Sequence, residues 1–235
     1  MARDDLLITC EHGGNRVPAG YRHLFAGRGA ERALRSHRGW DPGAIDVALA
    51  LVRRTGAPLH EARTTRLLVE LNRSPHHGRL FSEFSGVLSR DERAALLATH
   101  YFPYRDGVEQ AIRQRLETRR VVLHLSVHTF AGTWQGLQRA VDIGLLYDPA
   151  RPGERRLCAK WQARLWQIAP DLRVRRNYPY RGVADGLVTY LRRQFGLRRY
   201  VAIELEVSQS LVAAPGNARR RVIDVLARSL LAAVD

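Results

Sequence analysis

Residues 121–129 read VVLHLSVHT, and this stretch decides the fold that the sequence predicts. Its side chains alternate as they do along a β-strand, so Leu123, Leu125 and Val127 point to one side. The opposite side carries Val122, His124, Ser126 and His128. The stretch therefore predicts a buried strand that presents His128 where it ends.

Four other segments have strand patterns, and helical patterns lie between them. The predicted strands cover residues 6–10, 66–72, 142–147 and 200–207. The predicted helices cover residues 41–56, 90–120 with an interruption at 101–104, 154–168, 187–195 and 217–234. Because strands alternate with helices, we expect one α/β domain over residues 1–235, with a mainly parallel or mixed central sheet flanked by helices.

The composition is that of a globular protein. The chain has 235 residues, of which 45% are hydrophobic and 26% charged, enough for one sizeable domain. No apolar window is long enough to suggest a membrane span. The first residues, MARDD, carry acids where a signal peptide would be positive, so we expect a cytoplasmic protein. The two cysteines, Cys10 and Cys158, match neither a zinc finger nor a disulfide framework.

A formal charge of +15 is the strongest global feature, and Lys160 is the only lysine. Such a charge can indicate a nucleic-acid surface. The arginines are scattered, however, and the sequence contains no recognition-helix, zinc-finger or RNP-type motif. Nucleic-acid binding is therefore the less favoured hypothesis, and the same positive field would also attract a small anionic substrate.

Polar residues follow the ends of several predicted strands. His12 follows the strand at 6–10, Asn72 and Arg73 end the strand at 66–72, and Glu206 lies near the end of the strand at 200–207. In sheets of this class, sites form beyond the carboxyl ends of the strands, where His128 also emerges. Two histidines and an acid are typical of a catalytic zinc site, and a further carboxylate can move protons.

Each of these residues also has an ordinary structural interpretation. His12 can be a loop residue that bonds to nearby backbone groups. Asp41 can be the N-cap of the helix at 41–56, with Pro42 in its first turn. Arg73 can be a surface arginine. Taken singly, the residues leave these alternatives open.

Seven segments, in chain order, carry a resemblance to one enzyme family. They are EHGGNRVP at 11–18, WDPGAID at 40–46, ELNRS at 70–74, HGRLFSEFSG at 77–86, YFPYRDGV at 101–108, SVHTFAG at 126–132 and IELEVSQS at 203–210. With these segments the chain resembles the N-formylglutamate amidohydrolase family. That family is related in fold to zinc carboxypeptidases and aspartoacylases, so the resemblance implies a zinc carboxypeptidase-like hydrolase fold.

The resemblance implies one Zn²⁺ ion with His12 and His128 among its ligands. The carboxypeptidase pattern has an acid three residues after the first histidine, but this chain has Asn15 there, and asparagine is a poor zinc ligand. Asp41 is the preferred third ligand because its Trp-Asp pair matches the family. Glu11 is the alternative.

The resemblance also implies the remaining roles. Asn72 and Arg73 would bind the carboxylate of a small anionic substrate, and Glu206 would act as general base and acid. Zinc-activated water would attack the acyl carbonyl of an N-acyl amino acid, N-formyl amino acids included. Glu70 stands where the family has an aspartate, which leaves the exact substrate open.

Three hypotheses therefore follow. The first is a zinc-dependent amidohydrolase, and the second is a zinc peptidase or amidase of the same fold that acts on peptide or cell-wall substrates. The third is a nucleic-acid-binding protein. His124, deeper than His128 on the same strand face, is predicted to be a core residue or a support for the ligands. No motif specifies an oligomeric state.

Overall fold

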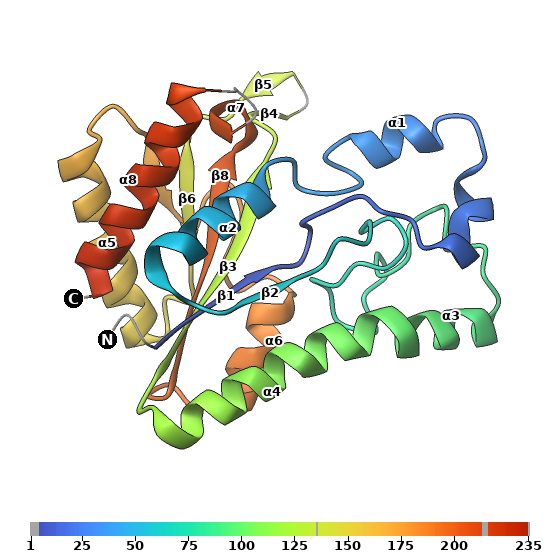
Figure 1. The fold of residues 1–235 in the computed structure, drawn as a ribbon, viewed down its shortest axis with the longest axis horizontal. Helices are drawn as coiled ribbons and strands as arrows, with labels where there is room; N and C mark the ends of the chain where they lie inside the picture. Colours follow the sequence, from blue (N-terminus) through green and yellow to red (C-terminus); the bar gives the residue numbers. More distant parts are fainter. Residues whose placement is uncertain (1–4, 135, 213–215, 235) are drawn as a thin grey trace.

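A six-stranded sheet forms the centre of the molecule in the computed structural model, which describes residues 5–134, 136–212 and 216–234 (Figure 1). The strand order is β2-β1-β3-β8-β6-β7. The bounds are β1 Leu6–Cys10, β2 Leu59–Glu61, β3 Val122–Phe130, β6 Ile143–Leu146, β7 Val174–Arg176 and β8 Tyr200–Ser208. Neighbouring strands are parallel except for β6 and β8, which are antiparallel. The predicted α/β fold with a mainly parallel, mixed sheet is confirmed.

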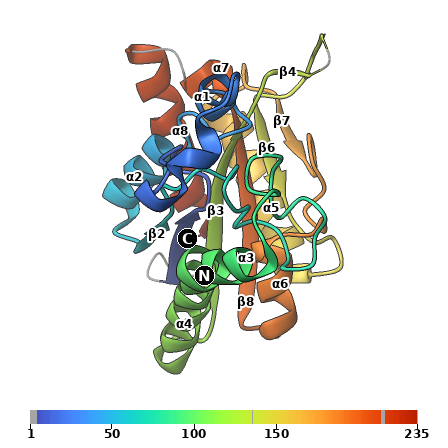
Figure 2. The same cartoon turned by 90° about the vertical axis from the view of Figure 1, so that its right-hand side faces the viewer.

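Helices cover both faces of this sheet, as Figures 1 and 2 show. One face packs against α2 (Ala44–Thr55), α5 (Pro152–Ile168) and α8 (Asn217–Val234). The other face packs against α4 (Phe102–Thr118) and α6 (Leu187–Gln194). The period of two along β3 divides its side chains between these layers, because Leu123, Leu125 and Val127 belong to the first core and Val122 to the second.

The predicted interruption in the helix at 90–120 is a change of helix type. The helix α3 (Arg90–Leu96) begins with a capping box, in which Ser89 accepts from the Glu92 N–H. A π-helical turn, Leu97–Tyr101, then leads directly into α4. Pro103 lies in the first turn of α4, where its missing N–H leaves few backbone groups unpaired.

Short elements complete the fold. They are a 3₁₀-helix (Ala19–Phe25), α1 (Ala30–Arg35), α7 (Gln209–Val212) and the two-stranded hairpin of β4 (Thr133–Trp134) and β5 (Leu137–Gln138). Among the described residues, no helix combines the length and apolar composition that a membrane-spanning segment requires.

The prediction of a strand at residues 66–72 is wrong. This segment is a series of turns, closed by hydrogen bonds such as those from Leu68 N–H to Thr65 O (3.1 Å) and from Arg73 N–H to Glu70 O (3.2 Å). Leu68, Val69 and Leu71 are buried in a separate small core against Leu96 of α3 and Tyr101 of the π-helical turn. The apolar run therefore reflects burial beside the sheet, and the short β2 takes the edge position next to β1.

Candidate active site

A cavity of about 570 Å³ opens at the carboxyl ends of β1, β3 and β8. All the site residues predicted from the sequence line it, namely His12, Asp41, Asn72, Arg73, His128 and Glu206. The structure therefore brings them to one place. For Asn72 and Arg73 this holds although the strand that was expected to deliver them is a series of turns.

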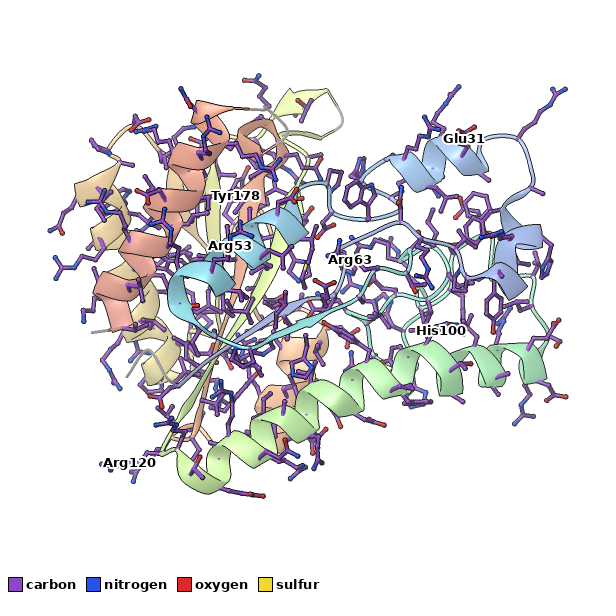
Figure 3. The ribbon with its side chains drawn as sticks, in the orientation of Figure 1. Glu31, Arg53, Arg63, His100, Arg120 and Tyr178 are labelled. Atoms are coloured by element: carbon purple, nitrogen blue, oxygen red, sulfur yellow. The ribbon has the colours of Figure 1, made fainter. Side chains whose placement is uncertain are left out.

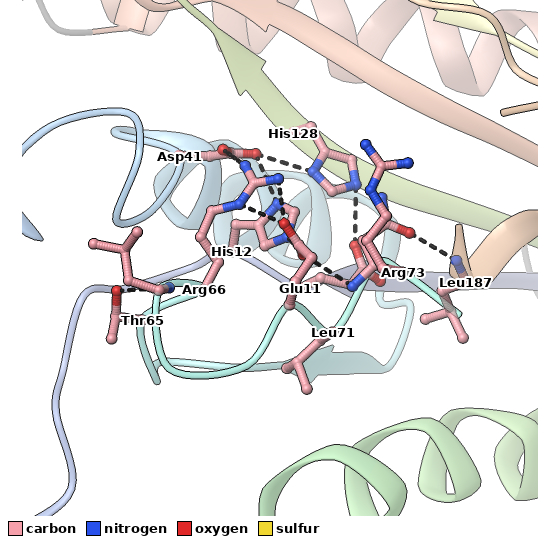
Figure 4. A network of polar contacts seen from close by, with 12 residues as sticks. Glu11, His12, Asp41, Thr65, Arg66, Leu71, Arg73, His128 and Leu187 are labelled. Atoms are coloured by element: carbon pink, nitrogen blue, oxygen red, sulfur yellow. Dashed lines mark hydrogen bonds and ion pairs between the residues drawn. The ribbon is translucent and has the colours of Figure 1, made fainter. Parts of the chain in front are cut away.

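Two imidazoles and one carboxylate converge at the floor of the cavity. Asp41 Oδ2 lies 3.3 Å from His12 Nδ1 and 3.0 Å from His128 Nδ1. One ligand atom from each of the three side chains lies within 4.8 Å of the others, which is close enough for a shared metal ion (Figure 4). Two histidine nitrogens and a carboxylate oxygen are a donor set that zinc prefers.

The far nitrogen of each imidazole is held by a carboxylate. His12 Nε2 makes a short contact with Glu70 Oε1. His128 Nε2 lies 3.1 Å from Glu11 Oε2 and 2.8 Å from Ser126 Oγ. Such partners favour a proton on Nε2 and leave the Nδ1 lone pair free to bind a metal. Glu11, the alternative third ligand, thus lies on the opposite side of His128 from Asp41.

The electrostatics of this cluster favour positive charge. Burial raises the pKa of Asp41, but His12, His128 and Arg66 together outweigh burial and hold that pKa below its usual range. The pKa of Glu11 is also low despite burial, because His128 bonds to the carboxylate. Burial lowers the pKa of His128, but hydrogen bonds to Asp41 and Glu11 raise it well above its usual value. The same negative surroundings would stabilise a divalent cation.

Asp41 owes its position to the turn that follows it. The helix α2 begins one turn later than expected, with Gly43 as its N-cap in the left-handed region at φ 84°. A Cβ at Gly43 would also lie 2.6 Å from Val212 Cγ2. The interpretation of Asp41 as a helix cap is therefore wrong: its carboxylate is free to face His12 and His128.

The turn that carries His12 depends on close packing of its glycines. A Cβ on Gly14 would lie only 2.7 Å from Arg63 O, so only glycine fits this approach. Asn15, which occupies the position of the expected acid, donates from Nδ2 to Leu34 O at 3.0 Å. Its side chain is therefore used to fix the loop.

Glu206 lies beside His128 across the sheet. The two residues are register partners on the parallel strands β3 and β8, so their side chains share one face. Burial raises the pKa of Glu206 to about 8. Its Oε2 atom is buried and has no hydrogen-bond partner among the residues that the structure describes. A buried carboxylate oxygen of this kind, at the wall of a cavity, is available to a bound substrate or water.

Asn72 and Arg73 connect the cavity to the loop before α6. Asn72 Oδ1 accepts from the Leu187 N–H at 2.7 Å, and Arg73 Nη1 donates to Asp185 O at 2.7 Å. The remaining guanidinium N–H groups of Arg73 have no carboxylate partner in the described part of the chain. They can still receive an anion in the bidentate manner typical of arginine.

Sequence reasoning missed Arg66, and it named Glu11 and Glu70 without assigning them as partners of the histidines. Arg66, Glu70 and Glu11 all bond to the side chains of His12, Asp41 or His128, and only the acids within matching motifs gave any signal. His124, by contrast, is a core residue with polar partners: Tyr200 Oη lies 2.6 Å from Nδ1 and Thr9 Oγ1 lies 2.8 Å from Nε2. Burial lowers the pKa of His124 to about 4.

Comparisons with known proteins identify the family and the fold of this chain. The sequence profile of the N-formylglutamate amidohydrolase family matches residues 4–213. The gene product Atu2144 from Agrobacterium tumefaciens is 28% identical, with a TM-score of 0.81 over 99% of this chain and 91% of that one. An N-formylglutamate amidohydrolase from Ralstonia eutropha JMP134 is 18% identical, with a TM-score of 0.70 over 97% of this chain and 92% of that one, which shows a shared fold. No curated protein matches the sequence.

Proposed function

The chain belongs to the N-formylglutamate amidohydrolase family, and from this premise we propose that it is a zinc-dependent hydrolase of N-acyl amino acids, including N-formyl amino acids. Family membership supports amide hydrolysis. His12 Nδ1, His128 Nδ1 and Asp41 Oδ2 converge beside a Glu206 oxygen that has no hydrogen-bond partner among the described residues, and this is the observation that carries the finer proposal. The cytoplasmic location stays a prediction.

The three converging side chains would hold the metal, and the residues around them would carry out the remaining work. Zinc at this place would act as a Lewis acid that polarises the acyl carbonyl and makes water more acidic. Glu206 takes a proton from the attacking water and then delivers it to the amide nitrogen as that nitrogen leaves. The products are the carboxylic acid of the acyl group and a free amino acid.

Arg73 would bind the carboxylate of the substrate at the cavity wall. Its free N–H groups offer paired hydrogen bonds, and its contact with Asp185 O fixes where the guanidinium points. Asn72 would assist through an amide N–H, since its carbonyl oxygen accepts from Leu187 and its side chain also bonds to Glu204. An anchored carboxylate places the acyl carbonyl at a defined distance from Glu206.

Metal analysis tests this proposal directly. We expect about one zinc per purified chain, loss of hydrolysis when a chelator removes it, and recovery when zinc is returned. His12→Ala and His128→Ala should lose the metal, whereas His76→Ala, an exposed loop histidine, should retain it. Wild-type protein that takes up no divalent metal would refute the zinc proposal.

Replacing Arg73 with methionine tests the substrate anchor. Charge-assisted hydrogen bonds contribute about 1.5–3 kcal/mol, so we expect KM to rise about 10- to 100-fold with a smaller change in kcat. The measurement is steady-state hydrolysis of an N-formyl amino acid and of its α-carboxamide. Wild type should hydrolyse the carboxamide less efficiently than the carboxylate, whereas the variant should hydrolyse the two equally well. A variant that still prefers the carboxylate would contradict the assignment.

The size of the cavity supports a second candidate. Cavities of roughly 300–1,000 Å³ typically hold drug-sized ligands, and this one has about 570 Å³. A zinc peptidase or amidase acting on short peptides or cell-wall fragments would use the same residues. Product analysis separates the two: formate or acetate is released from acyl amino acids, and amino acids are released from peptides.

The distribution of arginines favours an enzyme over a nucleic-acid-binding protein. In Figure 3, the labelled Arg53, Arg63 and Arg120 lie on separate parts of the molecule. Arg63 is also paired, at 2.7 Å, with Glu61. A nucleic-acid interface would instead gather its cations on one face, and its binding would survive loss of His12 and His128.

A further inference from the structure

We propose that Arg66 is a positioning residue for the metal site: its guanidinium joins Asp41 to Glu70 and so fixes the ligand atoms of Asp41 and His12. The proposal rests on the proposed function, because it concerns the affinity of the site named there. In the metal-free protein, Arg66 would already hold two of the three ligands in the orientation that metal binding requires.

The Arg66 side chain bridges two carboxylates at the edge of the cavity. Its Nη1 donates to Asp41 Oδ1 at 3.2 Å, and its Nε donates to Glu70 Oε2 at 2.7 Å. Its Nη2 forms an ion pair with the same Glu70 oxygen at 2.5 Å. Its side chain is 27% exposed, whereas those of Asp41 and Glu70 are 5% and 8% exposed. The two acids are thus held by a cation that lies beside Asp41 at the cavity (Figure 4).

Arg66 determines which oxygen of Asp41 can reach a metal. Because Arg66 occupies Oδ1, only Oδ2 faces the two histidines, at 3.3 Å and 3.0 Å from their Nδ1 atoms. A carboxylate held by one oxygen cannot rotate freely about its Cβ–Cγ bond. The contact therefore favours binding of an ion through Oδ2 alone.

Arg66 acts on His12 through Glu70. Glu70 uses Oε2 for Arg66 and Oε1 for His12 Nε2 and for the Asn72 N–H at 3.0 Å. This chain of contacts sets the orientation of the His12 ring and directs Nδ1 towards Asp41. His128 is held separately, by Glu11 and Ser126. Arg66 thus supports two ligands, and the third, His128, is linked to it only through Asp41.

Charge and geometry predict opposite effects when Arg66 is removed. A cation next to the site repels a divalent ion, so a purely electrostatic role would make the site bind zinc more tightly without it. Loss of a residue that orients ligands typically weakens metal binding about 10- to 100-fold. Removal would also leave Asp41 and Glu70 buried without their shared cation. We expect the geometric effect to dominate.

Zinc affinity, measured by competition with a chromogenic chelator, tests the proposal in the folded protein. Arg66→Met removes the charge and keeps most of the stem, and Arg66→Lys keeps the charge but cannot bridge both acids. We expect Kd to rise about 10- to 100-fold in the methionine variant and at least several-fold in the lysine variant. Arg38→Met, another cavity arginine that pairs with Glu83, should leave the Kd unchanged.

Each outcome supports or refutes the proposal. Tighter binding by Arg66→Met, with wild-type affinity in Arg66→Lys, would show a purely electrostatic role and overturn it. Equal affinity in all three proteins would also overturn it. If Arg66→Met does not fold, as judged by circular dichroism, the lysine variant decides alone. A wild-type protein without zinc affinity would be a failure of the proposed function, which the wild-type titration detects first.

Discussion

Replacing Glu206 with glutamine is expected to lower kcat about 10²- to 10⁴-fold, the usual contribution of a general base or acid. Glutamine has nearly the same shape but cannot accept the proton of the attacking water. Glu206 is not one of the three converging ligands, so zinc content should stay at the wild-type level. The measurement is kcat on an N-formyl amino acid together with elemental analysis of the same sample.

The pH dependence gives a second measurement for the same variant. A general base works only when ionised, so kcat/KM of the wild type should rise with pH through the pKa of Glu206. Burial raises that pKa to about 8. A nearby cation stabilises the carboxylate, so we expect the midpoint below 8 in the zinc-loaded enzyme. This rise of kcat/KM with pH should be absent in Glu206→Gln.

Glu204 provides a matched control for Glu206. It lies two residues earlier on β8 and lines the same cavity. Its carboxylate bonds to the Asn72 side chain and is affected by the charge of His128, but a glutamine at this position keeps an oxygen for the bond to Asn72. Glu204→Gln should therefore retain most of the activity. If Glu206→Gln has the wild-type kcat, Glu206 is not the general base and acid. If that variant loses zinc, Glu206 is a metal ligand instead.

The parts of the fold that the sequence predicted well are the ones whose patterns have a single physical cause. β3 and β8 lie inside the sheet with helices on both faces, so long apolar runs with alternating polar side chains identify them. β2 has only three residues, Leu59–Glu61, and none is fully buried. An edge strand of that length carries too little apolar patterning to be recognised.

The segment at 66–72 shows where patterning fails. Leu67, Leu68, Val69 and Leu71 are all buried, as in a central strand, but Leu68, Val69 and Leu71 pack against α3 and the π-helical turn. A local apolar pattern indicates that a segment is buried, but it does not identify the element against which the segment packs. The error left the site prediction intact, because Asn72 and Arg73 still line the cavity.

The candidate site could be predicted only in its inner part. The family motifs located His12, Asp41 and His128, and the structure brings them together. Which nitrogen of each imidazole faces the site depends on contacts far apart in the sequence. Glu11 and Glu70 occupy the Nε2 sides, and this arrangement follows from tertiary packing alone. The role of Arg66 depends on the same packing.

Glu154 gives the largest expected effect on stability. It is fully buried, with Arg192 Nη2 at 2.9 Å and Arg151 Nε at 3.1 Å, and it accepts from the Asp148 N–H at 2.8 Å. Glu154→Gln would leave two buried guanidinium groups without their anion. Removing one partner of a buried pair typically costs about 3–5 kcal/mol. We expect a loss of that size in the free energy of unfolding, measured by denaturant titration.

Two comparisons show whether burial of these ion pairs causes the expected loss of stability. Asp171→Asn breaks an ion pair with Arg221 whose side chains are 57% and 51% exposed, and it should hardly change stability. Replacing Arg151, Glu154 and Arg192 together with apolar residues should not restore stability. Arg151 Nη2 donates to Tyr200 O at 2.8 Å, so its loss leaves a buried carbonyl unpaired. Full recovery in the triple variant would show that the charges, and not these backbone contacts, dominate.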